Sequence, residues 1–459
     1  MVVAALALIA TAIQSLWLPV DADVSWLITV CERVLGGDRL YVDIIEVNPP
    51  ASVWLYMPFV WSAGRLGVRP EALVVAGFVL GSLASIAATV RLAEQLEGRE
   101  DSRWLAPAIA FVMLVLPMGL FAEREHAALL LATAALSAVA SIAEGRPLSF
   151  RSRLLWGAAA GLVIVLKPPF ALAILPASAW AVWRQRSVQL LIPAIAAACV
   201  ICALYALAVV IAAPAYFNLL PVLEQTYLRM HEVWWKLLVG ILLFPAITAA
   251  LAAMLRPPRF PPLAVAWGLG AAGFAAAALI QAKNYPNHWL PGAGLAALAL
   301  ATTMAMREID GGRRRLVGVA LLLLMAMEIN ATAIRPDPAL AAAIRRVAPP
   351  SPTVMALSTE LDTGHPVTRN VGGHWVGSRA ALFTAAGARF VGLEHPQAAA
   401  MYRADIQAFA VDVTAHQPDL ILVKMSEKQQ LMAEPEIRSA MQAYRPVSRA
   451  SGVELWLRR

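Results

Sequence analysis

The first residues able to do chemistry are two carboxylates at the start of a polar stretch. Asp21 and Asp23 follow directly after the apolar segment 2–20. A carboxylate beside lipid is partly desolvated, which raises its proton affinity and suits it to remove a proton from a hydroxyl group. The alternative is that one of the two caps the helix that follows, because aspartate is a preferred N-cap residue. The residue types alone leave both roles open.

A second cluster consists of four consecutive ionisable residues. Glu123, Arg124, Glu125 and His126 lie where one apolar segment ends and the next begins. Ionisable groups at a membrane boundary are costly unless they pair or line a cavity. As the wall of a site, Arg124 would face a phosphate group, and Glu125 or His126 would hold a sugar or a metal ion. As anchors, the same side chains would snorkel to the interface and form ion pairs with one another.

Two later stretches add cations and aromatic rings. Lys167 precedes two prolines that end an apolar run, and a lysine at a broken helix end is well placed to meet an anionic lipid headgroup. Lys283, Tyr285 and His288 stand close together between two apolar segments, with asparagines among them. Aromatic faces and amide groups are what a sugar ring needs. The alternatives are snorkelling for the lysines and an interfacial aromatic belt for the rings.

The composition indicates that a membrane domain positions these residues. The chain has 459 residues, of which 60% are hydrophobic and 15% charged, and its mean hydropathy is +0.66. Soluble domains carry about 25% charged residues. The net charge is +7, but the arginines stand in short clusters between apolar segments, which indicates topology and not nucleic-acid binding. About eleven transmembrane helices are predicted, near 2–20, 71–90, 104–121, 126–143, 154–170, 170–183, 190–217, 233–255, 261–281, 289–306 and 316–334.

The basic residues predict the orientation of these helices. Arginines gather in alternate short loops, as in 151–153 and 313–315, and the positive-inside rule makes these loops cytoplasmic. The polar clusters then share the opposite, outer face. The apolar segment 51–64 is short and is predicted to lie in the outer interface. The segment 2–20 has no basic region before it and no small-residue cleavage site after it, so it is predicted to be a retained helix.

The composition changes after residue 335, where prolines punctuate a linker. Short β-like runs then alternate with helix-like ones, and the β-like runs are 353–357, 420–425 and 453–459. The predicted fold class is an all-α polytopic membrane domain at 1–334, with a first outer loop at 21–70, followed by a small α/β soluble domain at 335–459. The sequence contains no P-loop, nucleophile elbow, HExxH motif or paired CxxC motif.

The order of the loop motifs resembles a known family. The motifs are an aspartate just after the first apolar segment, a helix ending in glycine, Pro49-Pro50, Arg124-Glu125-His126, the LKPPF run at 166–170 and the Lys…Tyr-Pro…His stretch at 283–288. In this order and on one common side, they look like the motifs of the GT-C glycosyltransferases, specifically the bacterial relatives of protein mannosyltransferases and of the lipid A aminoarabinose transferase. The resemblance covers the membrane part of the chain and extends loosely to the tail, which ends in ELWLRR.

The resemblance implies a GT-C fold and an inverting transfer of a monosaccharide from a polyprenyl-phosphate donor to a hydroxyl acceptor. It implies that an acidic residue of the first outer loop is the base, and Asp23 is preferred to Asp21 because Asp23 begins the helix that leads to Gly36. The chain departs from the family at Asn48, where relatives often have a lysine, so other cations must hold the donor phosphate. The residues predicted to do so are Arg124, Lys167 and Lys283. The residues predicted to contact the sugar or the acceptor are Asp43, Glu46, Glu125, His126, Tyr285 and His288.

The resemblance also sets the expected partners. They are a polyprenyl-phosphate sugar, a glycan, lipid or protein acceptor, and membrane lipids, without nucleic acid. No metal ion or other cofactor is predicted to be obligatory, because enough cations can neutralise a single departing phosphate; a divalent ion between acidic residues and His126 stays open. The predicted location is a bacterial inner membrane, with the C-terminal domain on the periplasmic side.

Two other classes of protein compete with this interpretation. A membrane transporter or flippase would also carry ionisable residues in its membrane domain, and Glu328 is the main charge well within an apolar run. A polymerase or ligase that uses a diphosphate-linked oligosaccharide would share the sidedness and the chemistry, and would differ in the size of its donor.

Overall fold

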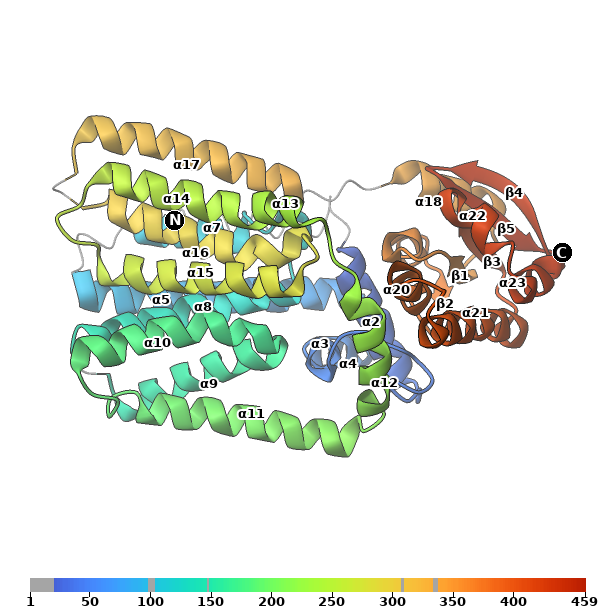
Figure 1. The fold of residues 1–459 in the computed structure, drawn as a ribbon, viewed down its shortest axis with the longest axis horizontal. Helices are drawn as coiled ribbons and strands as arrows, with labels where there is room; N and C mark the ends of the chain where they lie inside the picture. Colours follow the sequence, from blue (N-terminus) through green and yellow to red (C-terminus); the bar gives the residue numbers. More distant parts are fainter. Residues whose placement is uncertain (1–19, 98–103, 147, 307–308, 333–336) are drawn as a thin grey trace. The chain divides into compact units, whose positions relative to one another are not determined.

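A computed structural model describes residues 20–97, 104–146, 148–306, 309–332 and 337–459 (Figure 1). The chain is mostly helical, with a small sheet near its C-terminal end. Contacts between residues divide it into two compact units. As far as its residues are described, the first unit comprises 74–208 and 232–332, and the second comprises 20–73, 209–231 and 337–459. The predicted helix at 2–20 lies outside the described residues.

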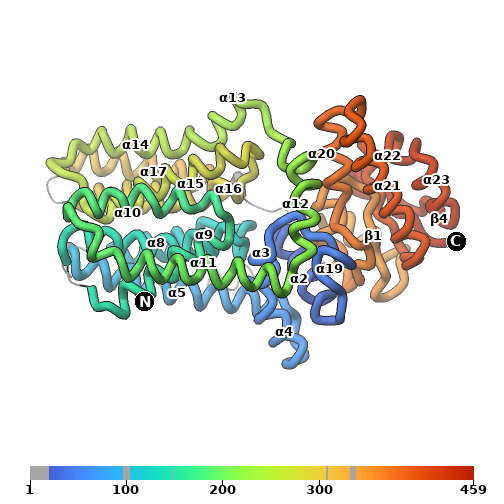
Figure 2. The backbone as a smooth tube through the Cα atoms, turned by 60° about the horizontal axis from the view of Figure 1, so that its bottom comes forward, coloured from blue at the N-terminus to red at the C-terminus, as the bar shows by residue number. Residues whose placement is uncertain are grey.

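The first unit is a bundle of long helices that run side by side (Figure 2). The first residues of α5 and the last residues of α11 belong to the second unit. The helices are α5 (Pro70–Glu97), α7 (Leu105–Leu114), η1 (Met118–Leu120), α8 (Arg124–Ala143), α9 (Phe150–Leu166), η2 (Pro168–Phe170), α10 (Ala171–Gln185), α11 (Ile192–Ala212), α13 (Trp234–Leu237), η4 (Leu238–Leu242), α14 (Leu243–Leu255), α15 (Pro262–Gln281), α16 (Pro286–Met304) and α17 (Gly311–Thr332).

Five helical segments among the described residues are long and apolar enough to cross a membrane. They are Pro70–Leu96, Arg124–Ala143, Ile192–Ala212, Trp234–Leu255 and Pro262–Gln281. The apolar stretch of α8 is 94% buried inside the protein, whereas that of α11 is 6% buried, as expected of a helix that faces lipid. The chain is therefore a multi-pass membrane protein. The predicted number of eleven spans stays a prediction.

The predicted break at the double proline is confirmed. Helix α9 ends at Leu166 and η2 begins at Pro168, and Lys167 between them has an extended backbone with φ −150° and ψ 118°. A proline disfavours helical backbone in the residue before it, and it cannot donate a main-chain hydrogen bond. The break leaves the side chain of Lys167 buried within the bundle.

Close packing between α10 and α15 depends on a glycine. A Cβ atom at Gly273 would meet main-chain atoms of Leu172 and Ala173, which cannot move aside as a side chain can. At Gly268 on the same helix, a Cβ atom would meet nothing within 4 Å. Small residues let helix backbones approach closely in membrane proteins. Gly268 and Gly273 therefore differ in their tolerance of a side chain.

The second unit joins the first polar stretch to the C-terminal domain. Its helices outside that domain are α2 (Ala22–Leu35), α3 (Pro50–Trp54), α4 (Met57–Leu66), α12 (Tyr216–Gln225) and η3 (Tyr227–Arg229). Helix α2 ends before Gly36, as predicted, and the predicted interfacial helix at 51–64 consists of two short helices, α3 and α4. The main-chain N–H of Ile45 donates to the carbonyl oxygen of Ser378 at 2.7 Å, so the stretch is bonded to the domain.

The C-terminal domain is an α/β fold, as predicted. Its strands are β1 (Thr353–Leu357), β2 (His374–Trp375), β3 (Leu420–Lys424), β4 (Tyr444–Ala450) and β5 (Val453–Arg458). They form one sheet in the order β2-β1-β3-β5-β4, in which β1 runs parallel to β2 and β3, and β5 runs antiparallel to β3 and β4. The predicted β-like runs correspond to β1, β3 and β5, whereas β2 and β4 were not predicted.

Helices of this domain pack on the sheet. They are α18 (Pro338–Val347), η5 (Leu361–Thr363), α19 (Val367–Asn370), α20 (Phe383–Val391), α21 (Pro396–His416), α22 (Met425–Leu431), α23 (Pro435–Ala440) and η6 (Met441–Ala443). The core lies between the central strands and α21, where Met355 and Ile421 pack with Tyr402, Ile406 and Phe409. Because the centre of the sheet is parallel and buried, β1 and β3 are almost continuously apolar.

We expect Gly273→Ala to lower the unfolding temperature of the protein in detergent, because the added methyl group must push α10 away from α15. Overpacking of this kind costs about 1–3 kcal/mol, which outweighs the better helix propensity of alanine. Gly268→Ala is the matched control on the same helix and should leave the unfolding temperature unchanged or raise it. Equal effects of the two substitutions would contradict the packing described for Gly273.

Candidate active site

The four ionisable residues at the start of α8 lie inside the first unit. The exposed fractions of Glu123, Arg124, Glu125 and His126 are all 3% or less. These side chains do not snorkel to a surface, and the partners described below come from within the bundle. Charges buried in this way are tolerated only when they are paired and hydrogen-bonded.

Glu125 is the central acceptor among these partners. Its carboxylate forms an ion pair with Nζ of Lys167, and its Oε2 lies 3.9 Å from Nε of Arg124. Nζ of Lys167 also donates a hydrogen bond of 3.2 Å to Oε1 of Gln281, in the last turn of α15. The start of α8, the break after α9 and the end of α15 therefore meet at one buried carboxylate.

The loop before α16 and the first turn of that helix each add one group to this meeting point. His288 lies within electrostatic range of Arg124, Glu125, Lys167 and Lys283. Burial, with a further contribution from the charge of Lys167, lowers the pKa of Lys283 to about 8. We call these five residues, Arg124, Glu125, Lys167, Lys283 and His288, the cation cluster. The sequence predicted all five as site residues, and the structure brings them together.

The start of α16 also carries polar atoms without partners. Nδ2 of Asn287 donates to Oε2 of Glu123 at 2.8 Å, which ties α16 to α8. Oδ1 of Asn287 and Nδ1 of His288 are buried and have no hydrogen-bond partner in the described part of the chain. Buried polar atoms without a partner are uncommon in folded proteins. A bound ligand could satisfy both atoms, and Tyr285, half exposed with its ring 5.5 Å from that of His288, stands beside them.

His126 is engaged on both sides of its ring. Its Nδ1 accepts a hydrogen bond from the main-chain N–H of Ala122 at 3.1 Å, and its Nε2 lies 2.8 Å from the carbonyl oxygen of Met113. This pattern fits the neutral ring with its proton on Nε2. The ring is buried and lies beside Phe78 and Phe121. Holding a sugar or a metal ion, as predicted, would therefore require His126 to give up one of these bonds.

In the second unit, the two aspartates at the start of α2 have different roles. Oδ2 of Asp21 accepts a hydrogen bond from the main-chain N–H of Asp23 at 2.7 Å, so Asp21 is the N-cap of the helix. Asp23 stands in the first turn, and both side chains are partly exposed. The capping alternative thus applies to Asp21. The preference for Asp23 as a base stays a prediction that this division of roles supports.

Glu46 is buried and bonded within its own loop. Its Oε1 accepts hydrogen bonds from the main-chain N–H of Asn48 at 2.8 Å and from Nδ2 of Asn48 at 2.5 Å, and its Oε2 accepts one from Nε1 of Trp26. The amide of Asn48, where the related transferases often have a lysine, is therefore used inside the loop. These bonds give Glu46 a structural role, and its predicted contact with a substrate stays a prediction.

Asp43 lies on the exposed side of the same loop. Its carboxylate accepts hydrogen bonds of 2.8 and 2.9 Å from the guanidinium of Arg39. These bonds hold the pKa of Asp43 below its usual range, so it is ionised near neutral pH. Its predicted contact with a sugar or acceptor is not tested by these bonds and stays a prediction.

The sequence did not single out every partner in these clusters. Gln281 was missed, although a polar side chain in the last turn of the apolar segment 261–281 was a usable signal. Arg369 of the C-terminal domain, which bonds to Glu32 and Glu71, was also missed. Its carboxylate partners lie 337 and 298 positions away in the chain, and no local pattern announces such a contact.

Solved structures resemble this chain along almost its whole length. ArnT from Cupriavidus metallidurans bound to undecaprenyl phosphate matches with a TM-score of 0.58 and 15% identity, over 99% of this chain and 97% of that one. The same protein in the apo state matches with a TM-score of 0.57 and 16% identity, over 99% of this chain and 96% of that one. No protein family and no curated protein matches the sequence.

These likenesses establish the class of fold. ArnT is a GT-C glycosyltransferase, so this multi-pass membrane protein has the fold of the GT-C glycosyltransferases, as its loop motifs predicted. At identities near 15% the likeness establishes the fold alone. The reaction is argued below from the chain's own residues.

We expect Glu46→Gln to destabilise the protein by about 1–3 kcal/mol, because an amide has one acceptor oxygen and leaves a buried donor of Asn48 or Trp26 unpaired. Thermal unfolding in detergent, followed by circular dichroism, measures the loss. Asp43→Asn, in the same loop but exposed, is the control and should leave the unfolding temperature nearly unchanged. A control as unstable as Glu46→Gln would show that the buried bonds are not the cause.

Proposed function

We propose that this protein is an inverting glycosyltransferase. It takes a monosaccharide from a polyprenyl-phosphate donor and transfers it to a hydroxyl group of a glycan, lipid or protein, on the periplasmic face of a bacterial inner membrane. The proposal is supported by the cation cluster and by the fold shared with ArnT, which has been solved with bound undecaprenyl phosphate. The arginine-rich loops of the sequence support a periplasmic C-terminal domain, through the positive-inside rule.

The charge of the cation cluster is the observation that carries the proposal. Three cations, Arg124, Lys167 and Lys283, share the site with two carboxylates, Glu123 and Glu125. Cations gathered in a buried place can stabilise a bound anion. A sugar phosphodiester carries one negative charge and is an anion of this kind. The long apolar tail of a polyprenyl donor would remain in the lipid around the bundle.

The proposed reaction needs one base and a set of cations. Asp23 removes the proton from the acceptor hydroxyl, and the hydroxyl oxygen attacks the anomeric carbon from the face opposite the phosphate. The bond between that carbon and the phosphate oxygen breaks, and the phosphate leaves with the electron pair. Arg124, Lys167 and Lys283 stabilise the negative charge of the leaving group. The configuration of the anomeric carbon is inverted once, because the reaction is a single displacement.

The proposal includes no obligatory metal ion. The cations of the cluster supply the charge stabilisation that a metal ion would otherwise give to the departing phosphate. His126 is a poor candidate ligand, since both of its ring nitrogens are already engaged. A divalent ion therefore has no assigned step in this mechanism.

Mass spectrometry of lipid-linked sugars tests the reaction directly. In cells that lack this gene, one polyprenyl-phosphate sugar should accumulate, and the wild-type protein should clear it. Asp23→Asn should not clear it, because loss of a general base slows such reactions by about 10²–10⁴-fold. If no such lipid changes in these cells, the transferase proposal fails and transport becomes the function to test.

Two matched substitutions make this experiment specific. Asp21→Asn removes the same charge but keeps the cap of α2, since asparagine is as good an N-cap as aspartate. Glu224→Gln removes a carboxylate from the exposed face of α12. Both variants should clear the lipid at a rate near that of wild type. Loss of clearance in Asp21→Asn, with Asp23→Asn active, would transfer the role of base to Asp21.

We expect donor binding to weaken as the pH rises through the pKa of Lys283. Burial has lowered that pKa to about 8, so Lys283 is cationic below this pH and neutral above it. Binding of undecaprenyl phosphate, measured between about pH 7 and pH 9, should fall several-fold in wild type. Lys283→Arg keeps its charge over this range and should bind with little pH dependence. An equal fall in both proteins would show that Lys283 does not meet the phosphate.

A further inference from the structure

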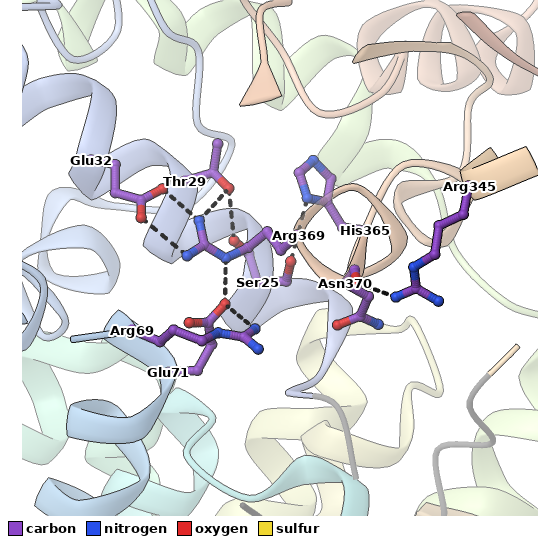
Figure 3. Close-up of polar contacts among 9 residues, drawn as sticks. All are labelled: Ser25, Thr29, Glu32, Arg69, Glu71, Arg345, His365, Arg369 and Asn370. Carbon is purple, nitrogen blue, oxygen red and sulfur yellow. Dashed lines mark hydrogen bonds and ion pairs between the residues drawn. The ribbon is translucent and has the colours of Figure 1, made fainter. Parts of the chain in front are cut away.

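We propose that Arg369 of the C-terminal domain is a positioning residue, which fixes α2 and with it the aspartate at the start of that helix. The catalytic part of this inference rests on the proposed function, whereas its structural part does not. The residues that carry it all belong to the second unit, and those that bond to Arg369 are drawn in Figure 3.

Arg369 joins three segments that are distant in the sequence. Its Nη1 and Nη2 donate to the two carboxylate oxygens of Glu32 on α2, at 2.5 and 3.0 Å. Its Nε donates to Oε1 of Glu71, in the first turn of α5, at 2.8 Å, and Nη1 lies 3.4 Å from Oγ1 of Thr29 (Figure 3). The guanidinium thus bonds α2 and the first turn of α5, both parts of the second unit, to the C-terminal domain.

The electrostatics of this point require a cation. The side chain of Arg369 is 12% exposed, and its two acceptors are both carboxylates. Burial alone would lower the pKa of Arg369, but the bonds and charges of Glu32 and Glu71 raise it above its ordinary value. Without the guanidinium, Glu32 and Glu71 would lose the cation that they share, and Glu71 would keep only its contact with the exposed Arg69 among the ion pairs described here. The like charges of the two carboxylates would then disfavour the approach of α2 to the first turn of α5.

The shape of the guanidinium also matters. Arginine presents five donors in a planar fork, which allows two parallel bonds to one carboxylate and a third bond to another. A lysine carries its charge at one nitrogen and cannot reproduce this geometry. The site is therefore built for arginine, and Arg369→Lys is a conservative test of geometry at constant charge.

Arg369 is one point of a longer contact along one face of α2. Nδ1 of His365 lies 3.5 Å from Oγ of Ser25, and its ring lies 5.2 Å from that of Trp26. At the other end of the helix, Nη1 of Arg33 donates to the carbonyl oxygen of Gly377 at 2.5 Å. Ser25, Thr29, Glu32 and Arg33 recur at the three- and four-residue spacing of a single helix face. The segment 365–377 of the domain therefore follows α2 over most of its length.

This contact bears on the proposed reaction through the rigidity of α2. Asp23 stands about 9 Å along the helix from Thr29, at a rise of about 1.5 Å per residue. A small tilt of α2 at the Arg369 contact would displace Asp23, and a misplacement of about 1 Å can reduce turnover by about 10²-fold. Arg369 acts through the helix and has no assigned contact with the substrate.

Hydrogen exchange of the full chain in nanodiscs tests the structural part. In Arg369→Ala, amides of residues 22–35 should exchange about tenfold faster or more, whereas those of α8 should not change. The control is Arg345→Ala, since Arg345 on α18 donates an exposed hydrogen bond to the carbonyl oxygen of Asn370, beside Arg369 (Figure 3). It should leave the exchange of α2 unchanged. Unchanged protection of α2 in Arg369→Ala would overturn the inference.

Kinetics test the catalytic part with the same variants. Turnover should fall about tenfold or more in Arg369→Ala and less in Arg369→Lys. The affinity for undecaprenyl phosphate should stay within about twofold of wild type, because the cation cluster is in the other unit. A parallel loss of turnover, donor affinity and protection throughout the chain would mean general unfolding and would overturn a positioning role.

A third variant separates positioning from unpaired charge. Glu32→Gln, Glu71→Gln and Arg369→Gln in combination remove all three charges together, and Arg69, which loses its 3.3 Å contact with Glu71, is 70% exposed and stays solvated. We expect this triple variant to regain the stability lost in Arg369→Ala while its turnover stays low. Recovery of turnover along with stability would overturn the positioning role. If wild type transfers no sugar, the proposed function fails, and the exchange experiment still decides the structural part.

Discussion

The structure of the first unit depends on how cations neutralise the negative charge of one buried carboxylate. Glu125 is fully enclosed, and a carboxylate in that position is stable only if cations reach it with good geometry. Lys167 reaches it because the double proline ends α9 one residue too early for lysine to join the helix. Arg124 approaches it from the start of α8 itself. The break after α9 and the start of α8 therefore place the two cations beside Glu125.

Close approach of the helices is the second requirement of that balance. Hydrogen bonds such as that from Lys167 to Gln281 form only when helix ends meet within a few ångströms. Alanine and glycine along α8, α10 and α15 allow this, and Gly273 against the main chain of Leu172 is the clearest case. The buried hydrogen bonds therefore depend on the close helix packing that the small residues allow. Bulkier helix faces would hold the charges apart and leave them unpaired.

The sequence predicted local breaks and shared sidedness, but not the long-range partners. A double proline after an apolar run ends a helix wherever it occurs. The sequence left undecided only whether the side chain of Lys167 is exposed or buried. Arg124, Glu125, Lys167, Lys283 and His288 were grouped because their loops share one side of the membrane, and they meet. Snorkelling was an equal alternative for Arg124, because a sequence shows no cavity.

Other features had no local signal. The strand β4 has three consecutive exposed residues, with proline at its third position. This pattern also suits a loop, and the pairing of β4 with β5 decides its conformation. The bonds of Arg369 depend on the folded sheet that carries α19. Asp21 and Asp23 were equivalent candidates for the cap until the start of α2 was fixed at Ala22. In each case a tertiary contact chooses between two conformations that the local sequence allows.

The contact between α2 and the C-terminal domain joins residues that are synthesised at different times. Glu32 leaves the ribosome 337 residues before Arg369, its partner. At about 5–20 residues per second, this separation corresponds to about 20–70 s of chain synthesis. During that interval α2 has emerged without the segment that will cover it. The second unit can therefore be completed only after the residues of the first unit have been made, since these lie between its two halves in the chain.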